Sequence, residues 1–318
     1  MNILALSFEP ACALLKLLEQ GGKNIRLKNM QAQENQKFRV LILSGSQRRK
    51  KDWPQRDSKS SALMKHMMDR LPKDWIIDFE DLGNVKDRER IQPCNACVSS
   101  SMALCCWPCN CYAPNDKKMP DLLWNLDMYA RLEAADAWAI ISPVNWNGPT
   151  SNLKLMFDRL VCMNGGNPRP DLIEKDGFKN ADKAAELEHT KLWSEISQNH
   201  LEGRTAGFFI HGDFATEERG EDGRPVALRH KEYFDFERDE LKDQRDTYKP
   251  LVHQCRYSGI EVPDHLWRYE LIGYRKLYSD NQIEDIEPKH YETFNMWVDN
   301  FKTFVTKKGK VPHAKYPV

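Results

Sequence analysis

The stretch that decides the fold is FRVLILSGS, residues 38–46. Its apolar run stops abruptly at Ser44-Gly45-Ser46, in the manner of a buried parallel strand that ends at the carboxyl edge of a sheet. Polar capping residues and an amphipathic run follow, so we expect a helix to begin near Ser60. The pattern predicts a strand, a loop and a helix, which together form the first unit of a parallel α/β sheet.

The same alternation of apolar strands and amphipathic helices repeats along the chain. We expect further strands at 75–79, 137–141, 203–210 and 267–272, and further helices at 119–134, 152–160, 239–258 and 291–304. Parallel strands need right-handed crossovers, which place helices on both faces of the sheet. The sequence therefore predicts a doubly wound, five-stranded parallel α/β sheet with helices on both faces and with helical and charged insertions.

Composition narrows the class of partner. The chain has 318 residues, and its 47 Lys and Arg are balanced by 47 Asp and Glu. Balanced charge gives no general attraction to nucleic acid or to an anionic membrane, and no run approaches the ~20 apolar residues of a membrane span. Six of the nine cysteines fall between Cys94 and Cys111, whereas a secreted disulfide framework spreads its cysteines. We expect a cytoplasmic protein with a small-molecule partner and no nucleic-acid or membrane partner.

The chain divides into one large domain with flanking segments. We expect an N-terminal extension at 1–36, a domain at 37–306 with insertions at about 167–202 and 213–250, and a C-terminal tail at 307–318. The first twenty residues lack the basic start of a signal peptide. Segment 213–250 is dense in charges of both signs, which is typical of a solvated excursion.

The loop after the first strand has the groups that bind a phosphate. In doubly wound folds, ligands bind outside the carboxyl ends of the strands. Ser44, Ser46 and Arg48 follow the first strand, and Ser58 and Ser60 stand at the start of the next helix. Hydroxyls, backbone N–H groups, a helix N-terminus and an arginine all favour an anion. The loop lacks both GxxxxGK[ST] and GxGxxG, so neither a nucleoside-triphosphate loop nor a dinucleotide fingerprint is supported.

The loop after the third strand makes the pattern specific. It reads SPVNWNGPTSNLK, residues 142–154, and is followed by Asp158-Arg159. Together with the GSQR of residues 45–48, it makes the chain resemble the NAD(P)H-dependent FMN reductase group of flavodoxin-like proteins over roughly residues 38–162. That resemblance implies a flavodoxin-like fold and an NAD(P)H-dependent FMN-containing oxidoreductase, with FMN as cofactor and NAD(P)H as co-substrate.

Carried over position by position, the resemblance implies a flavin site built by three loops. The FMN phosphate would be held by Ser44, Ser46, Arg48, Ser58 and Ser60. The isoalloxazine edge would lie along Pro143, Val144, Asn145, Asn147 and Gly148, with Trp146 flanking the ring, and a third loop would contribute His211, Gly212 and Asp213. We assign no catalytic side chain, because the cofactor supplies the chemistry. Asp158 and Arg159 fall on a helix and are expected to form caps or salt bridges.

The cysteine segment leaves four interpretations open. Iron–sulfur relatives use C-x2-C-x2-C, but here the third position is Ser100. Candidate ligands for an iron–sulfur cluster or for zinc are Cys94, Cys97, Cys105 or its neighbour Cys106, and Cys109. Cys94 and Cys97 could also form a redox dithiol, or the thiols could pack a compact loop as small hydrophobic groups. No metal is assigned.

The expected reaction is transfer of a hydride from NAD(P)H to N5 of FMN, followed by reduction of free flavin, a quinone, a nitro or azo compound, or a metal ion. Two alternatives are an electron-transfer flavoprotein with a cysteine-ligated iron–sulfur cluster and a flavodoxin-like binding module without catalysis. Members of the resembled family form dimers or tetramers, so the resemblance also allows a homo-oligomer, with segment 181–200 and the aromatic C-terminal region as candidate interfaces.

Overall fold

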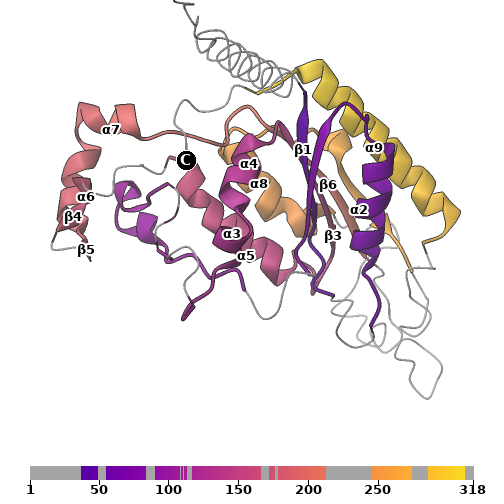
Figure 1. Ribbon diagram of the computed structural model, residues 1–318, viewed down its shortest axis with the longest axis horizontal. Coiled ribbons are helices and arrows are strands. Elements are labelled where there is room, and N and C mark those ends of the chain that lie inside the picture. Colours follow the sequence, from indigo (N-terminus) through magenta and orange to yellow (C-terminus); the bar gives the residue numbers. More distant parts are fainter. Residues whose placement is uncertain are drawn as a thin grey trace, which may run out of the picture.

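A five-stranded parallel sheet forms the centre of the computed structural model (Figure 1). The model describes residues 37–48, 55–83, 90–107, 109, 111–112, 117–165, 172–175, 178–212, 245–273 and 286–311. The strands are β1 (Arg39–Ser44), β2 (Ile76–Asp81), β3 (Ala137–Pro143), β6 (Thr205–Gly212) and β7 (Trp267–Leu271). Their order is β2-β1-β3-β6-β7, and every pair is parallel. This is the flavodoxin-like order and confirms the predicted fold class.

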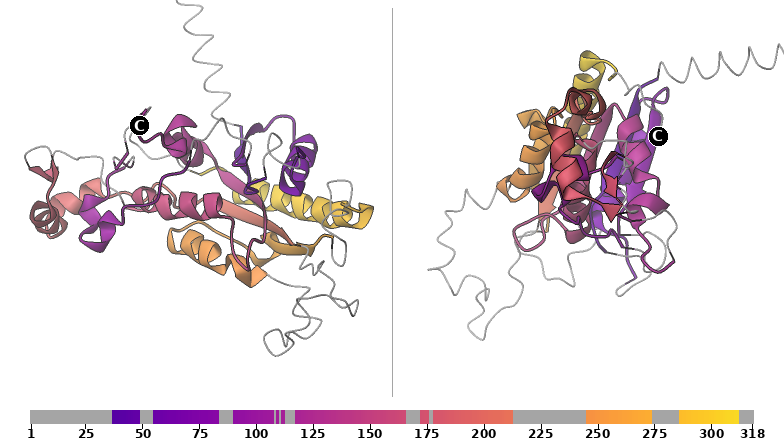
Figure 2. Two further views of the ribbon diagram at one scale, coloured as in Figure 1. Left: turned by 90° about the horizontal axis from the view of Figure 1, so that it is seen from below. Right: turned by 90° about the vertical axis from the view of Figure 1, so that its left-hand side faces the viewer.

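Helices cover both faces of the sheet, as Figures 1 and 2 show. One face carries α2 (Lys59–Arg70) and α9 (Pro288–Lys308), which pack with Val40 and Ile42 of β1. The other face carries α4 (Met128–Ala134), α5 (Ser151–Arg159) and α8 (Lys249–Tyr257), which pack with Leu41 and Leu43. Successive side chains of a strand point to opposite faces. An uninterrupted apolar run such as VLIL is therefore what a strand buried on both sides requires.

The prediction of a single helix at 119–134 is wrong. The structure has α3 (Leu122–Asn125) and α4, separated at Asp127, whose φ of 50° lies in the left-handed region. A helix cannot pass through a residue in that conformation, so the chain turns there. By contrast, α9 is longer than expected and reaches Lys308, where Gly309 with φ of 88° ends it.

The remaining elements are short. They are the hairpin β4 (Glu174–Lys175) and β5 (Phe178–Lys179), helices α6 (Ala181–Glu188) and α7 (Lys191–Ile196), and the 3-10 helices η1 (Cys97–Ser99), η2 (Met102–Leu104), η3 (Leu160–Met163), η8 (Arg245–Tyr248) and η9 (Asp264–Leu266). The helix expected at 239–258 is α8 preceded by η8, and residues 239–244 lie outside the described residues. So do the expected extension at 1–36, most of the excursion at 213–250, and residues 312–318.

The insertion after β3 has a small core of its own. Ala184 and Leu187 of α6 pack with Leu104, Cys106 and Ile173, and so join the insertion to the cysteine segment. In Figure 1 this unit lies at the opposite end of the molecule from α9. Among the described helices, the longest apolar stretches fall short of what a membrane span needs.

Candidate functional site

The loops after β1 and β3 meet at one rim of the sheet. The backbone N–H of Gly45 donates to the carbonyl of Ile141 at 2.8 Å, and the hydroxyl of Thr150 donates to the carbonyl of Gly45. A Cβ atom on Gly45 would lie 2.4 Å from Oγ of Ser142, which is closer than any side chain tolerates. Glycine is therefore required here because it lets the two loops approach each other.

A cavity of about 370 Å³ opens between these loops and the end of β6. It is lined by Ser46, Gln47, Arg48, Ser58, Lys59, Pro143, Val144, Asn145, Thr150, His211, Gly212 and Ile272. Eight of the residues expected from the sequence are in this set: Ser46, Arg48, Ser58, Pro143, Val144, Asn145, His211 and Gly212. All three predicted loops thus contribute to one cavity at the carboxyl ends of β1, β3 and β6.

The other expected site residues lie beside the lining or outside the described chain. Ser44 is buried and its Oγ has no hydrogen-bond partner, whereas Ser60 is buried against His211. Trp146 is 97% exposed and, with Asn147, adopts positive φ in the turn that closes between Asn145 and Gly148. Asp213 lies outside the described residues. Trp146 therefore projects into solvent in the single chain, at the rim of the cavity.

The charge of the cavity favours an anion. Arg48 and Lys59 are cationic, and none of the described residues in the lining is a carboxylate. Helix α2 begins at the cavity, where the hydroxyl of its N-cap Ser58 accepts from the backbone N–H of Ser61 at 3.0 Å. The partial positive charge of a helix N-terminus adds to the two cations. A phosphate is the ligand group that this combination binds best.

The end of β2 packs against the loop after β1, a contact that was not predicted from the sequence. A Cβ on Gly83 would lie 2.5 Å from the carbonyl oxygen of Ser46 and 2.7 Å from that of Arg48. The hydroxyl of Ser61 donates to Asp81, which also accepts from the backbone N–H of Gly83 at 3.2 Å. Only the lone glycine after the acidic end of β2 could have signalled this contact in the sequence.

The loop after β3 is held by residues from two other elements. The backbone N–H of Val144 donates to the carbonyl of His211 at 2.7 Å. The hydroxyl of Tyr248 lies 2.6 Å from Oγ of Ser142 and 2.8 Å from the carbonyl oxygen of Pro143. Tyr248 is fully buried and comes from a segment that the sequence analysis assigned to the surface. These contacts fix the backbone that faces the cavity.

His211 is a buried, neutral histidine at the end of β6. Its Nε2 lies 2.8 Å from Oγ of Ser60. Burial, aided by the positive charge of Lys59, lowers the pKa of His211 to about 3. At neutral pH its ring therefore carries no charge, and the cations of the cavity remain Arg48 and Lys59.

The buried His211 predicts a pH dependence of stability. Its pKa is 6.5 in an unfolded chain and about 3 in the fold, so the unfolded chain binds an extra proton between these values. Stability should fall as the pH drops below about 6.5, by up to about 1.4 kcal/mol per pH unit. In urea titrations from pH 8 to 4, His211→Gln should flatten this fall, because glutamine does not titrate. Parallel pH profiles for the two proteins would contradict the assignment.

Asp158 and Arg159 form salt bridges away from the cavity. Asp158 pairs with Lys154 one helical turn earlier. The guanidinium of Arg159 is buried and donates to Asp121 at 2.7 Å and to the hydroxyl of Tyr129 at 2.7 Å. Both residues therefore have structural partners, and Arg159 joins α5 to the segment that follows the cysteines.

The four candidate metal ligands do not converge in the structure. The Sγ of Cys94 accepts from the backbone N–H of Ala96 at 3.4 Å, whereas Cys105 and Cys109 are buried in the main core. Cys97 instead contacts Cys111. Across the part of the chain that the structure describes, no three His, Cys, Asp or Glu side chains are grouped so that they could hold a metal ion.

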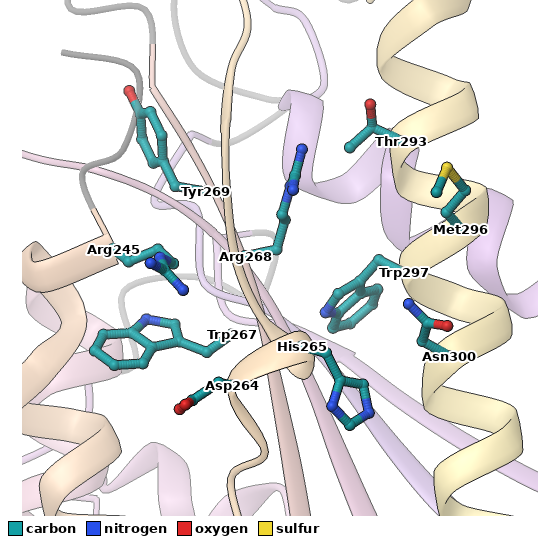
Figure 3. Close-up of a pocket in the computed structure, with 10 residues that line it drawn as sticks. All are labelled: Arg245, Asp264, His265, Trp267, Arg268, Tyr269, Thr293, Met296, Trp297 and Asn300. Atoms are coloured by element: carbon teal, nitrogen blue, oxygen red, sulfur yellow. The ribbon is translucent and has the colours of Figure 1, made fainter. Parts of the chain in front are cut away.

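A larger cavity, of about 610 Å³, lies along the edge strand β7 and helix α9 (Figure 3). Its charged groups are already engaged within the protein. Arg268 pairs with Glu270 at 3.7 Å, Asp264 pairs with Arg256 at 2.9 Å, and the guanidinium of Arg245 lies 5.7 Å from the ring centre of Trp267. The cavity flanks a strand and does not face the carboxyl ends of the sheet, so it is a poorer candidate for the phosphate of a nucleotide.

Fold and cavity together define a doubly wound α/β protein with a cationic cavity at the carboxyl ends of its strands. Residues 38–176 match the family model of NADPH-dependent FMN reductase. The match confirms the resemblance found in the sequence. The match supports an NAD(P)H-dependent FMN oxidoreductase, with FMN as cofactor and NAD(P)H as co-substrate.

Solved structures of similar topology are distant in sequence. RosB with bound 8-demethyl-8-formylriboflavin-5'-phosphate is 14% identical, with 85% of this chain and 79% of that chain covered and a TM-score of 0.43. The flavoenzyme NAD(P)H:(acceptor) oxidoreductase FerB from Paracoccus denitrificans is 15% identical, with 86% and 99% covered and a TM-score of 0.40. The NAD(P)H:quinone oxidoreductase from Methanothermobacter marburgensis is 14% identical, with 87% and 99% covered and a TM-score of 0.36. No curated protein sequence matches the chain. The assignment rests on the family match.

Proposed function

We propose that the protein uses NAD(P)H to reduce a small-molecule acceptor, such as a quinone, a free flavin, or a nitro or azo compound, through FMN bound in the cavity at the ends of β1, β3 and β6. One observation carries this proposal. The three loops at this rim form a single cavity whose described lining pairs two cations with a helix N-terminus and includes no carboxylate. FMN would supply the redox chemistry there, namely hydride transfer from NAD(P)H and electron transfer to the acceptor.

The residues of the chain fit each part of FMN. Arg48, Lys59 and the N-terminus of α2 would hold the phosphate, and Ser46 is placed beside them. The unpartnered hydroxyl of Ser44, at the end of β1, is a further donor close to this loop. Backbone from Pro143 to Asn145, together with Gly212, would border the flavin ring, because these groups also line the cavity.

The side chains of the cavity can position the cofactor and the substrate. Among the lining residues that the structure describes, none is acidic, and His211 is neutral and hydrogen-bonded to Ser60. The lining therefore offers little side-chain acid–base chemistry. Tyr248 and Gly45 instead fix the two loops that face the ligand. This division suits a flavoenzyme, in which the protein orients the reactants and excludes competing reactions.

Absorption spectroscopy tests the function directly. Purified protein, or protein incubated with FMN and then separated from unbound FMN, should show flavin absorption bands at about 375 and 450 nm. NADPH or NADH added under argon should bleach the 450 nm band, and a quinone or an azo dye should restore it. Protein that takes up no FMN would overturn the proposed site. Protein that holds FMN but is bleached only by dithionite would leave a flavin-binding module without this activity.

We also infer the compartment, the domain division and the oligomeric state of the protein. The described cysteines are all thiols, which suits a reducing cytoplasmic compartment. The domain division proposed above places the end of the core at 306, two residues before α9 ends at Lys308. The exposed ring of Trp146, at the rim of the cavity, suits contact with a second copy of the chain in a homo-oligomer. Size-exclusion chromatography with light scattering tests the last point.

A further inference from the structure

Two cysteines of the segment after β2 are in sulfur–sulfur contact. The Sγ of Cys97 lies 3.4 Å from the Sγ of Cys111. Cys97 begins η1, and both side chains are partly exposed. A disulfide joins its sulfurs at about 2.05 Å, so the two thiols need only a small approach to bond. The sequence had suggested the C-x-x-C pair of Cys94 and Cys97, and the structure brings together a different pair.

The neighbouring thiols are poorer partners. Cys105, Cys106 and Cys109 are buried. The hydrogen bond of Cys109 to Cys111, together with burial, raises the pKa of Cys109 well above its ordinary value, and a buried thiol that resists ionisation reacts slowly. Cys94 is partly exposed, but its sulfur accepts a hydrogen bond from the backbone of Ala96. Within the described segment, accessibility and sulfur contact coincide at Cys97 and Cys111.

We propose that Cys97 and Cys111 are a thiol-oxidation site, which forms an intramolecular disulfide by exchange with a small-molecule disulfide such as oxidised glutathione. The thiolate of one cysteine attacks the small disulfide, breaks its S–S bond and releases one thiol. The second cysteine then attacks the mixed disulfide, forms the Cys97–Cys111 bond and releases the other thiol. Two electrons pass from the cysteines to the small disulfide, and the two thiol protons leave with its two halves.

The bond would join two parts of the molecule that pack separately. Cys97 packs against the small cluster that contains α6 and Ile173, whereas Cys111 packs against the main core under the sheet. The two residues are 14 positions apart in the chain. Closing such a loop restricts the unfolded chain more than the folded one. Oxidation should therefore link the insertion covalently to the core and raise the thermal stability of the protein.

Differential alkylation of the full-length, FMN-loaded protein tests this proposal. The protein is equilibrated with oxidised glutathione, unfolded in urea with N-ethylmaleimide so that buried thiols are blocked as well, reduced, and labelled with iodoacetamide. No Lys or Arg lies between Arg90 and Lys117, so six thiols share one tryptic peptide and tandem mass spectrometry must locate the labels. We expect the second label at Cys97 and Cys111 and the first label at Cys94. Dithiothreitol should reverse the modification.

Matched variants keep the test independent of folding. Oxidation should raise the Tm of the parent and of Cys94→Ser by about 5 °C, and it should leave the Tm of Cys97→Ser and Cys111→Ser unchanged. A second label at Cys94 and Cys97, or the first label at both Cys97 and Cys111, would overturn the proposal. So would stoichiometric zinc or iron in the purified protein that Cys97→Ser releases, because those thiols would then be metal ligands.

Discussion

Replacing Arg48 and Lys59 together with alanine will release FMN from the protein. Both side chains line the cavity, and no other described lining residue carries a full positive charge, because His211 is neutral. A hydrogen bond to a charged group contributes about 1.5–3 kcal/mol, so losing two should raise the Kd for FMN by a factor of about 10² to 10⁴. Fluorescence titration of the apoprotein with FMN measures this change, because flavin emission changes on binding.

The matched control is Arg70→Ala. Arg70 stands in the last turn of the same helix whose first turn holds Lys59, and it pairs with Asp299 on the surface at 3.4 Å. The substitution changes the net charge of the protein and one side chain of α2, but it alters no residue that lines the cavity. The Kd for FMN should stay within about twofold of the parent, because surface charges are screened by salt. A double variant that binds FMN as tightly as Arg70→Ala would place the phosphate elsewhere. Riboflavin, which lacks the phosphate, should respond little to either change.

The sequence was sufficient for the fold because its strongest signals are local. The run at residues 38–46 shows at once a strand buried on both faces and the loop that ends it, and both features are in the structure. The lining of the cavity was partly predictable for the same reason. Ser46 and Arg48 follow directly from β1, and Pro143 to Asn145 follow directly from β3. In a parallel sheet, neighbouring strands end at the same edge, so the loops that follow them lie close together without any further signal in the sequence.

Contacts between residues far apart in the chain could not be predicted in this way. Gly83 packs against the loop after β1 only because β2 lies beside β1. Tyr248 contacts Pro143 although the two residues are 105 positions apart in the sequence. The break at Asp127 depends on one backbone conformation that an amphipathic pattern does not reveal. The cysteine pairing was missed because C-x-x-C spacing draws attention to Cys94 and Cys97, whereas the contact of Cys97 with Cys111 depends on how the loop folds back.

Replacing Asp121 with alanine will destabilise the protein strongly. Asp121 is fully buried and accepts from both terminal nitrogens of the Arg159 guanidinium. Arg159 is itself 1% exposed, so the variant leaves a charged group in the interior without its counter-ion. Breaking a buried pair by removing one partner costs about 3–5 kcal/mol. Urea unfolding of the apoprotein measures the loss without the stabilisation that bound FMN would add.

Two further variants separate the ion pair from simple packing. Asp158→Ala removes the neighbouring carboxylate, whose bridge to Lys154 is exposed, and should cost no more than about 1 kcal/mol. Replacing Arg159 by methionine in the Asp121→Ala background removes the unpaired charge and should recover part of the lost stability. If the double variant is as unstable as Asp121→Ala, the loss arises from packing around Tyr129 and not from the buried charge. Because Asp121 and Arg159 are outside the cavity, the folded fraction of each variant should bind FMN with the affinity of the parent, which distinguishes a residue that supports the fold from one that holds the cofactor.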